Sequence, residues 1–324
     1  MRMRMFGRLA SCALAIAAYV SVARADDVLH VGKAVPPDYG FTTVNVGIAA
    51  GTFAKHGLQV DAIDFGGAPK LHQAMLAGGA EIGLSGGPDF ALLAKGAPEL
   101  AIAVLANRPS GLEVYARDGS GIETVKDLKG RKISISAEGT LSDWLMRQLI
   151  RRQGWPANAI DILALGAPTA QAAAMRSGQL DGMFIDVVMA AQLNAQHIGK
   201  VIVNFGDVVR NYPIEMIYAT VDTIQHRPED VRRFLAGWFD TVAFMRSHKD
   251  ETVTILAPLT RVDPVALGGI YDQMMPTFST DGRFDPKALA VLGQSLVDLG
   301  LTGEKPEMSK LYTAAFLPLR AAGH

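Results

Sequence analysis

The segment Gly83-Leu-Ser85-Gly-Gly87 matches the G-x-S-x-G pattern of a hydrolase nucleophile elbow, in which a serine hydroxyl attacks an acyl carbon. It follows a predicted strand and precedes a predicted helix, as such an elbow does. A serine nucleophile also needs a base within hydrogen-bond reach, and the downstream candidates His226 and His248 both lie in a predicted helical region. The sequence has no HGGG-type oxyanion loop. We therefore expect the chain not to be an enzyme. A secreted hydrolase that uses Ser85 stays an alternative to that expectation.

Other polar and small residues point to binding rather than catalysis. Gly66-Gly67 and Gly139-Thr140 precede predicted helices, where free backbone N–H groups and the helix dipole favour an anion. Lys33 either pairs with such an anion or lies solvated, and Asp186 either accepts from a ligand or caps a helix. We expect the ligand-binding residues to be Lys33, Tyr39, Gly66, Gly67, Ser85, Gly86, Gly139, Thr140, Leu141, Ser142 and Asp186.

The start of the helix predicted at 141–152 allows a second interpretation. Thr140-Leu-Ser-Asp143 resembles a capping box, although glutamate is usual at its last position. Capping alone would account for Thr140 and Ser142. A cap and a ligand can share one helix terminus, so both roles stay open.

Metal, nucleotide and nucleic-acid chemistry find no support in the sequence. The seven histidines are scattered, with no pair three or four residues apart that would hold a metal on one helix face. No phosphate-binding G-x-x-x-x-G-K-[ST] loop occurs, so the chain is not expected to be an ATPase. The formal net charge is -1, and no basic stripe suits a phosphate backbone. We expect no metal, no cofactor and no nucleic-acid partner.

The first 25 residues are typical of a secretory signal peptide. Three arginines within the first eight residues precede an apolar run from Leu9 to Ala23, and Ala23-Arg-Ala25 supplies small residues for cleavage. The apolar run is shorter than the roughly 20 residues that span a bilayer. Cleavage after Ala25 removes four arginines and shifts the formal charge from -1 to -5. It also removes Cys12, the only cysteine, so we expect a periplasmic protein without disulfides.

The rest of the chain alternates between strand-like and helix-like segments, which predicts parallel sheets covered by helices. The pattern restarts near residue 124, and Met75–Glu81 and Met175–Asp181 share Met-x-x-Gly-x-x-acid, so we expect two similar halves. Beyond Ile217 the sequence is mainly helical. The predicted strands are 28–35, 60–65, 81–84, 132–135, 160–165 and 183–185, and the predicted helices include 41–56, 68–77, 88–95, 141–152 and 168–176, with two more starting at Pro228 and Pro286.

Several segments occur in an order that resembles one family. They are Gly57-Leu-Gln-Val, Gly66-Gly67, Met75 to Gly83, Asp127 to Ile133, Gly178 to Asp181 and His226 to Phe234. Together with the export signal, this order resembles the nitrate/sulfonate/taurine-type, thiamine-precursor-like solute-binding proteins of ABC importers. The likeness covers nearly the whole mature chain.

The resemblance implies an α/β fold of the two-lobed, type II periplasmic binding protein class, with two mostly parallel sheets flanked by helices and a helical C-terminal part on the first lobe. It implies crossovers near 106–111 and 204–213. The expected division is a signal peptide at 1–25, a first lobe at 26–108 plus 214–324, and a second lobe at 109–213. Ligand would bridge the lobes and stabilise their closed arrangement.

The implied partner is a membrane permease with its separate ATPase, and we expect a monomer. A binding module that serves a receptor stays an alternative, which adjacent permease and ATPase genes would argue against. The family often carries an aromatic residue where this chain has Val187, and an apolar or aromatic residue where it has Lys33. These departures weigh against taurine-like specificity. We expect a small organic anion, such as a sulfonate or carboxylate, because of Lys33 and the helix N-termini.

Overall fold

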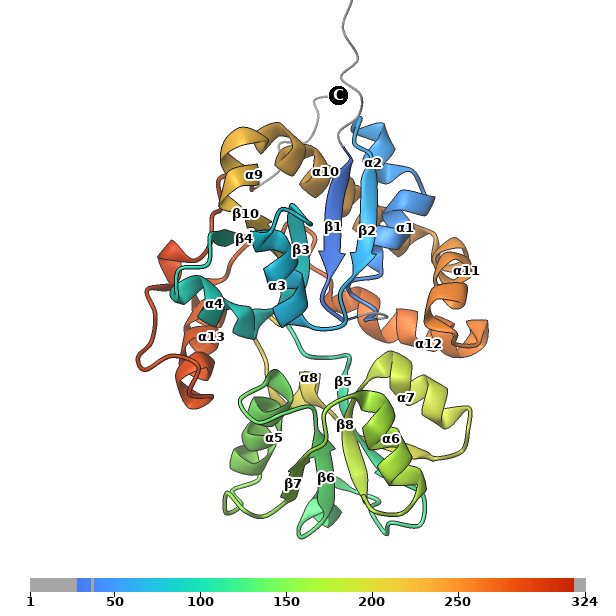
Figure 1. Cartoon of the computed structure of the whole chain (residues 1–324). Coiled ribbons are helices and arrows are strands. Elements are labelled where there is room, and N and C mark those ends of the chain that lie inside the picture. Colours follow the sequence, from blue (N-terminus) through green and yellow to red (C-terminus); the bar gives the residue numbers. More distant parts are fainter. Residues whose placement is uncertain (1–27, 36–37, 318–324) are drawn as a thin grey trace, which may run out of the picture.

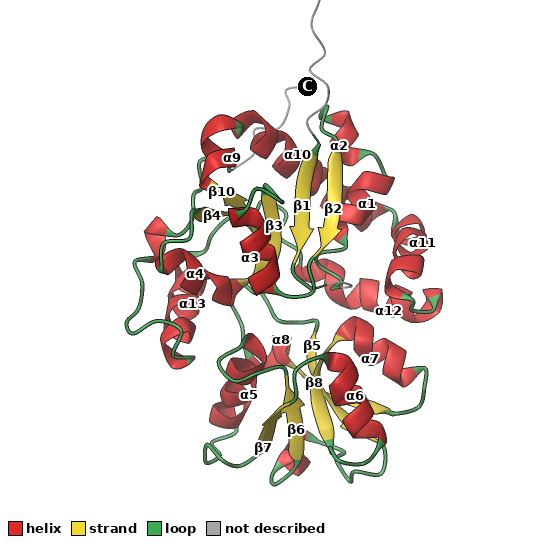
Figure 2. Ribbon diagram, in the orientation of Figure 1, coloured by secondary structure: helices red, strands yellow, loops and turns green. Residues whose placement is uncertain are grey.

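The computed structural model describes residues 28–35 and 38–317, so the predicted signal peptide and Cys12 lie outside the described residues. The chain forms two five-stranded sheets, one in each of two lobes that lie end to end (Figure 1). The first lobe contains β1 and the second contains β6. Helices cover the faces of both sheets (Figure 2), which confirms the predicted fold class.

The two sheets share one arrangement of strands. The first has the order β2-β1-β3-β10-β4 and the second the order β7-β6-β8-β5-β9. The strands are β1 (Leu29–Lys33), β2 (Val60–Asp64), β3 (Ile82–Gly86), β4 (Glu99–Ala106), β5 (Leu112–Arg117), β6 (Lys132–Ile135), β7 (Asp161–Ala164), β8 (Gly182–Asp186), β9 (Gly199–Asn204) and β10 (Glu215–Thr220). The fourth strand in each order, β10 or β5, runs antiparallel to both of its neighbours. Each of these strands directly follows a crossing between the lobes.

The helices alternate with the strands until the C-terminal part, which is helical and packs on the first lobe (Figure 1). They are α1 (Thr43–Ala49), α2 (Thr52–Lys55), α3 (Ala68–Leu76), α4 (Phe90–Ala94), α5 (Leu141–Arg152), α6 (Pro168–Arg176), α7 (Val187–Asn194), α8 (Phe205–Val208), α9 (Val221–His226), α10 (Pro228–Ser247), α11 (Lys249–Thr260), α12 (Pro264–Met274) and α13 (Pro286–Asp298). Within the described ranges, no single helix is long and apolar enough to cross a membrane. Among the described residues, one pair of segments, 249–260 and 264–277, bent by 112°, passes that test by length and composition.

The prediction of one continuous helix at 41–56 is wrong, because the segment forms two helices, α1 and α2. Gly51 adopts a left-handed conformation, with φ of 69°, and separates α1 from α2. A side chain at this position would strain the backbone, so glycine permits the break. The short α2 then packs against α10, where the rings of Phe53 and Phe234 stack at 5.3 Å.

The repeated Met-x-x-Gly-x-x-acid segments have the same structural role in both lobes. Glu81 accepts a hydrogen bond from the backbone N–H of His30 at 2.8 Å, at the start of β1. Asp181 accepts from the backbone N–H of Lys132 at 3.0 Å, at the start of β6. Each acid thus satisfies a backbone donor that begins the neighbouring strand.

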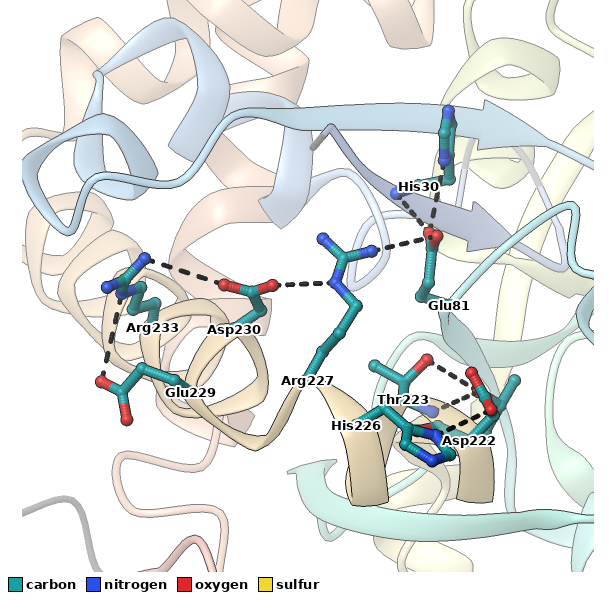
Figure 3. Close-up of polar contacts among 10 residues, drawn as sticks. His30, Glu81, Asp222, Thr223, His226, Arg227, Glu229, Asp230 and Arg233 are labelled. Atoms are coloured by element: carbon teal, nitrogen blue, oxygen red, sulfur yellow. Dashed lines mark hydrogen bonds and ion pairs between the residues drawn. The ribbon is translucent and has the colours of Figure 1, made fainter. Parts of the chain in front are cut away.

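Glu81 also connects the first sheet to the C-terminal helices (Figure 3). Arg227 Nη1 lies 3.3 Å from Glu81 Oε1, and its Nε donates to Asp230 at 2.8 Å in the first turn of α10. Arg233 lies on the far side of Asp230, at 3.8 Å. This chain of charges ties the segment His226–Phe234 to the sheet that it covers.

The close approach of α10 and α2 gives a test of this packing. A Cβ on Gly237 would lie 2.5 Å from the Phe53 ring and 3.0 Å from its Cα, so Gly237→Ala must push the two helices apart. We expect Gly237→Ala to lower the free energy of unfolding by about 1–3 kcal/mol, measured by urea denaturation. The matched control is Gly269→Ala in α12, where a Cβ meets no atom within 4 Å. That control should be neutral or stabilising by up to about 1 kcal/mol, and equal losses in both variants would contradict the packing argument.

Candidate functional site

A small pocket lies between the lobes and is lined by segments from both. Its volume is about 10 Å³, roughly the space that one water molecule needs, so the two lobes lie close together here. The lining residues are Asp38, Tyr39, Gly40, Arg108, Pro109, Gly111, Leu112, Asp186, Val187, Ile214, Glu215 and Met274. They come from the turn after β1, both crossing segments, the end of β8 and the end of α12. A ligand larger than water therefore reaches this site only when the lobes separate.

Two acids of the first lobe meet in this pocket. Asp38 lies in the turn after β1, where its Oδ1 accepts a hydrogen bond from Phe41 N at 3.1 Å. Glu215 is the first residue of β10, and the reversed direction of this strand places its start beside Gly86, the last residue of β3. A Cβ on Gly40 would lie 1.9 Å from Glu215 Oε2, so only glycine allows the turn to approach this carboxyl group.

Asp186 brings a third acid from the second lobe. It ends β8 and caps α7, since its Oδ1 accepts from Val188 N at 2.9 Å and from Met189 N at 3.0 Å. The capping role that the sequence left open is therefore present. Asp186 also lines the pocket, so its predicted contact with a ligand is compatible with the cap and stays a prediction.

Burial and mutual repulsion raise the pKa values of these acids. Burial raises the pKa of Asp38 to about 7, and the negative charge of Asp186 adds to the rise. Burial also raises the pKa of Glu215 well above its usual value, with Asp38 contributing. Burial likewise raises the pKa of Asp186. Glu113, on β5 beside them, has a pKa of about 7 because of burial, which outweighs the hydrogen bond from Gln273, and because of Asp186.

Of the predicted ligand-binding residues, Tyr39 and Asp186 line this pocket. Tyr39 is 2% exposed, and its hydroxyl has no hydrogen-bond partner among the described residues. Lys33 is buried and lies outside the lining. Its Nζ donates to Asn45 Oδ1 at 2.8 Å and lies 2.9 Å from Asp64 Oδ1, so an anionic ligand would compete with a carboxylate already in place.

Ser85 lies in a buried polar cluster whose geometry does not match that of an activated nucleophile. Ser85 is fully buried and its hydroxyl donates to Asp89. Asp89 lies 3.0 Å from His72 Nε2, and His72 Nδ1 lies 2.6 Å from Glu99 Oε2. Asp89 thus stands between the serine and the histidine that a triad would place together.

The same cluster keeps His72 charged. Burial opposes the imidazolium, but the hydrogen bonds with Asp89 and Glu99 outweigh it and raise the pKa of His72 to about 9. A protonated histidine cannot take a proton from a serine, so it is no general base near neutral pH. The adjacent Gly86 accepts a hydrogen bond from the Tyr218 hydroxyl at 2.7 Å, which ties this loop to β10.

The two predicted helix N-terminal sites also lie outside the pocket lining. Gly66 and Gly67 precede α3 with φ values of 59° and 141°, which favour glycine. At α5, Gly139 N donates to Asp143 Oδ2 at 3.0 Å, and Thr140 Oγ1 donates to Ala137 O at 2.6 Å. These bonds order the loop before α5, where Leu141 is the first helical residue and the Ser142 and Ser136 hydroxyls lie 2.9 Å apart. Thr140 makes no side-chain capping hydrogen bond to α5, so the predicted capping box is wrong, and Asp143 accepts from Gly139 N instead.

Most residues of the pocket were not predicted. Asp38 lies next to Tyr39, which was predicted to bind ligand, but was not itself among the predicted residues. Arg108 lies within the first crossing segment. Glu215 follows the second, and only the three-dimensional topology brings it to the end of β3. In the part of the chain that the structure describes, no group of three or more His, Cys, Asp or Glu residues is arranged to hold a metal ion.

The raised pKa values predict how stability depends on pH. The folded protein retains protons on Asp38 and Glu113 up to about pH 7, whereas the unfolded chain releases them near pH 4. Stability should therefore fall as pH rises from about 4 to about 7, by about 1.4 kcal/mol for each unit of raised pKa. Glu215→Gln removes a further acid whose pKa is raised by burial and by Asp38, so it should make this decline in stability less steep. Thermal midpoints from pH 4 to 8 would measure the effect. A midpoint that rises across this range would contradict the prediction.

Curated relatives of this chain are described as binding proteins. A "Putative binding protein" of Brucella abortus (strain 2308) is 26% identical over 261 residues, which are 78% of each chain. A "Putative aliphatic sulfonates-binding protein" of Bacillus subtilis (strain 168) is 24% identical over 69% of this chain and 67% of its own.

Solved structures show the same fold. The periplasmic aliphatic sulphonate binding protein SsuA from Escherichia coli superposes with a TM-score of 0.76 at 19% identity, over 92% of this chain and 94% of its own. The desulfurization enzyme DSZB superposes with a TM-score of 0.65 at 19% identity, over 89% of this chain and 97% of its own. The family described as NMT1/THI5 like matches residues 39–252, about two thirds of the sequence. This chain therefore belongs to the NMT1/THI5-like family.

Proposed function

We propose that this protein is the extracytoplasmic solute-binding component of an ABC importer. It captures a small ligand between its lobes in the periplasm and delivers it, as a monomer, to a membrane permease that works with a separate ATPase. The observation that carries the proposal is a pocket lined by both lobes and both crossing segments. The names of the relatives support the class, since they are binding proteins, and SsuA is described as periplasmic.

The crossing segments support a hinge. The chain leaves the first sheet after Ala106 and returns at Glu215. The two crossings bond to each other, with Tyr212 N donating to Asn107 O at 3.1 Å and Ile214 N to Ala106 O at 3.0 Å. We place the lobes at 26–108 plus 214–324 and at 109–213, with rotation about these paired segments.

Contacts on two sides of the pocket favour closure. On one side, Asp298 of α13 accepts from Trp144 Nε1 at 3.3 Å and from Arg151 Nη2 at 3.2 Å, both on α5. On the other, Gln192 of α7 donates to Thr260 O at the end of α11 at 2.7 Å. These groups reach across the lobes without lining the pocket, so they stabilise the closed state whatever the ligand.

The ligand expected from the sequence was a sulfonate or carboxylate. The sulfonate-binding relatives support that choice. Three carboxyl groups and one basic residue, Arg108, line the pocket, and this balance does not favour an anion at the carboxyl groups themselves. Arg108 is exposed and is the lining group suited to a negative charge.

The alternatives have less support. A hydrolase would need Ser85 to reach a base, and Asp89 intervenes. The fold also occurs in DSZB, an enzyme, so the fold alone does not decide the question. A receptor rather than a permease as partner would use the same closed state.

Binding can be tested with a thermal-shift screen of the mature protein against sulfonates, carboxylates, nitrate, amino acids and amines. A ligand at 100 times its Kd should add about 2.7 kcal/mol of stability. Ser85→Ala should bind as the wild type does, and neither protein should hydrolyse model esters. Ester turnover that Ser85→Ala abolishes, with no stabilising compound in the screen, would favour the hydrolase.

The interlobe contacts predict a second effect. Asp298→Ala should weaken binding of the strongest stabiliser from that screen about two- to fivefold, because an exposed ion pair and one hydrogen bond are lost from the closed state only. Calorimetry would measure the affinity. Glu307→Ala is the matched control, since it removes an exposed ion pair with Lys310 inside one lobe and should leave affinity unchanged. If Asp298→Ala and Glu307→Ala changed the affinity equally, the interlobe contacts of Asp298 would not explain closure.

A further inference from the structure

The acids at the interface of the lobes have no cationic partner. Asp38, Glu113, Asp186 and Glu215 form no ion pair with any residue in the ranges 28–35 and 38–317. A charge taken out of water costs free energy unless a partner compensates it. The pocket therefore holds uncompensated negative charge whenever these groups ionise.

Buried acids elsewhere in the chain are paired. Asp143 is 3% exposed and its Oδ1 lies 2.7 Å from Arg147 Nε. Glu99 is 2% exposed and lies 2.6 Å from the protonated His72. The missing partner is thus a property of the pocket and not of buried acids in this protein generally.

Polar atoms without partners surround the same place. The Tyr39 hydroxyl, Glu215 Oε2 and Glu113 Oε2 are all buried and make no hydrogen bond with the described residues. Tyr39 is 2% exposed and lines the pocket, as does Glu215, whose Oε2 lies directly over Gly40. Buried polar atoms are rarely left unbonded, and two of these three residues, Tyr39 and Glu215, line the pocket.

On the basis of the proposed function, we propose that the transported ligand carries a positively charged nitrogen, which the carboxylates of Asp38 and Glu215 bind from the first lobe and that of Asp186 binds from the second. Tyr39 supplies a further oxygen acceptor. Charge-assisted N–H···O bonds to carboxylates are stronger than neutral ones, so one ammonium or amidinium group can satisfy several of these oxygens. Arg108 remains available for an anionic part of the same ligand.

This arrangement couples the charge of the ligand to closure. Besides burial, the negative charge of Asp186 raises the pKa of Asp38 across the lobes, so closing the empty protein favours a proton on Asp38. A cation placed between them removes the repulsion and adds attraction to both lobes. The ligand thereby binds the closed state better than the open one, which is the condition for shifting the equilibrium between them.

A matched set of probes tests the sign of the charge. Ethanolamine and 2-hydroxyethanesulfonate share a two-carbon alcohol and differ in the charge of the terminal group, and choline and putrescine extend the cationic side. We expect the mature, full-length protein to be stabilised in thermal-shift experiments by one or more of the cations and not by 2-hydroxyethanesulfonate. Stabilisation by the sulfonate alone would overturn the inference and leave the proposed function standing.

Two variants connect binding to the carboxyl groups. Glu215→Gln and Asp186→Asn keep the shape of the side chain, and asparagine can still cap α7. Each should weaken binding of the best cation at least about tenfold in calorimetry, while the ligand-free protein becomes no less stable. If the role of either residue were only structural, its substitution would lower the stability of the ligand-free protein instead. Glu304→Gln, which changes an exposed acid outside the pocket, is the control and should bind as the wild type does.

Cation affinity that survives both substitutions would overturn the inference. So would a broad screen in which compounds bind but none carries a positive nitrogen. A screen in which no compound of any charge binds would count against the proposed function itself, so the two failures are distinguishable.

Discussion

The architecture depends on a constraint of connectivity: each lobe receives one strand from the chain as it arrives from the other lobe. β5 and β10 enter their sheets antiparallel to both neighbours, so the start of each lies beside the carboxyl ends of the parallel strands. Ligands of open α/β sheets bind at those carboxyl ends. The first residues of the arriving strands, Leu112 and Glu215, therefore line the pocket together with the turn after β1 and the end of β8. Hinge and pocket are consequences of the same two crossings.

Among the described residues, several acidic side chains away from the pocket have basic partners, whereas those within it have none. Away from the pocket, Glu81, Glu99 and Asp143 each have a basic partner, and Glu81 uses it to join strands and helices that are distant in sequence (Figure 3). In the pocket, acids from both lobes face one another with burial and repulsion raising their pKa values. Compensated charges stabilise one arrangement of the chain, whereas uncompensated ones make the arrangement of the lobes depend on protons and ligands.

Much of the fold could be predicted because its signals are local. The stripe on α10, from Val231 to Met245, is buried as its spacing indicates, and the strands and helices that alternate through β1 to β3 and β6 to β8 follow the expected order. The strands β4, β5, β9 and β10 were not predicted. No helix separates β4 from β5, and only the four-residue α8 lies between β9 and β10, so the alternation is weak there. Asp186 could be found because it ends a strand and starts a helix. Glu215 could not, because its place beside Gly40 arises from a contact between residues 175 positions apart.

The small volume of the pocket has a kinetic consequence. The lobes leave room for about one water molecule in the pocket, so a larger solute enters or leaves only when they move apart. The residence time of the solute would then depend on how often the lobes part as well as on how quickly the contacts inside break. A membrane partner that pulls the lobes open would act as recipient and as trigger at once, and the solute would be released where it is needed and retained elsewhere.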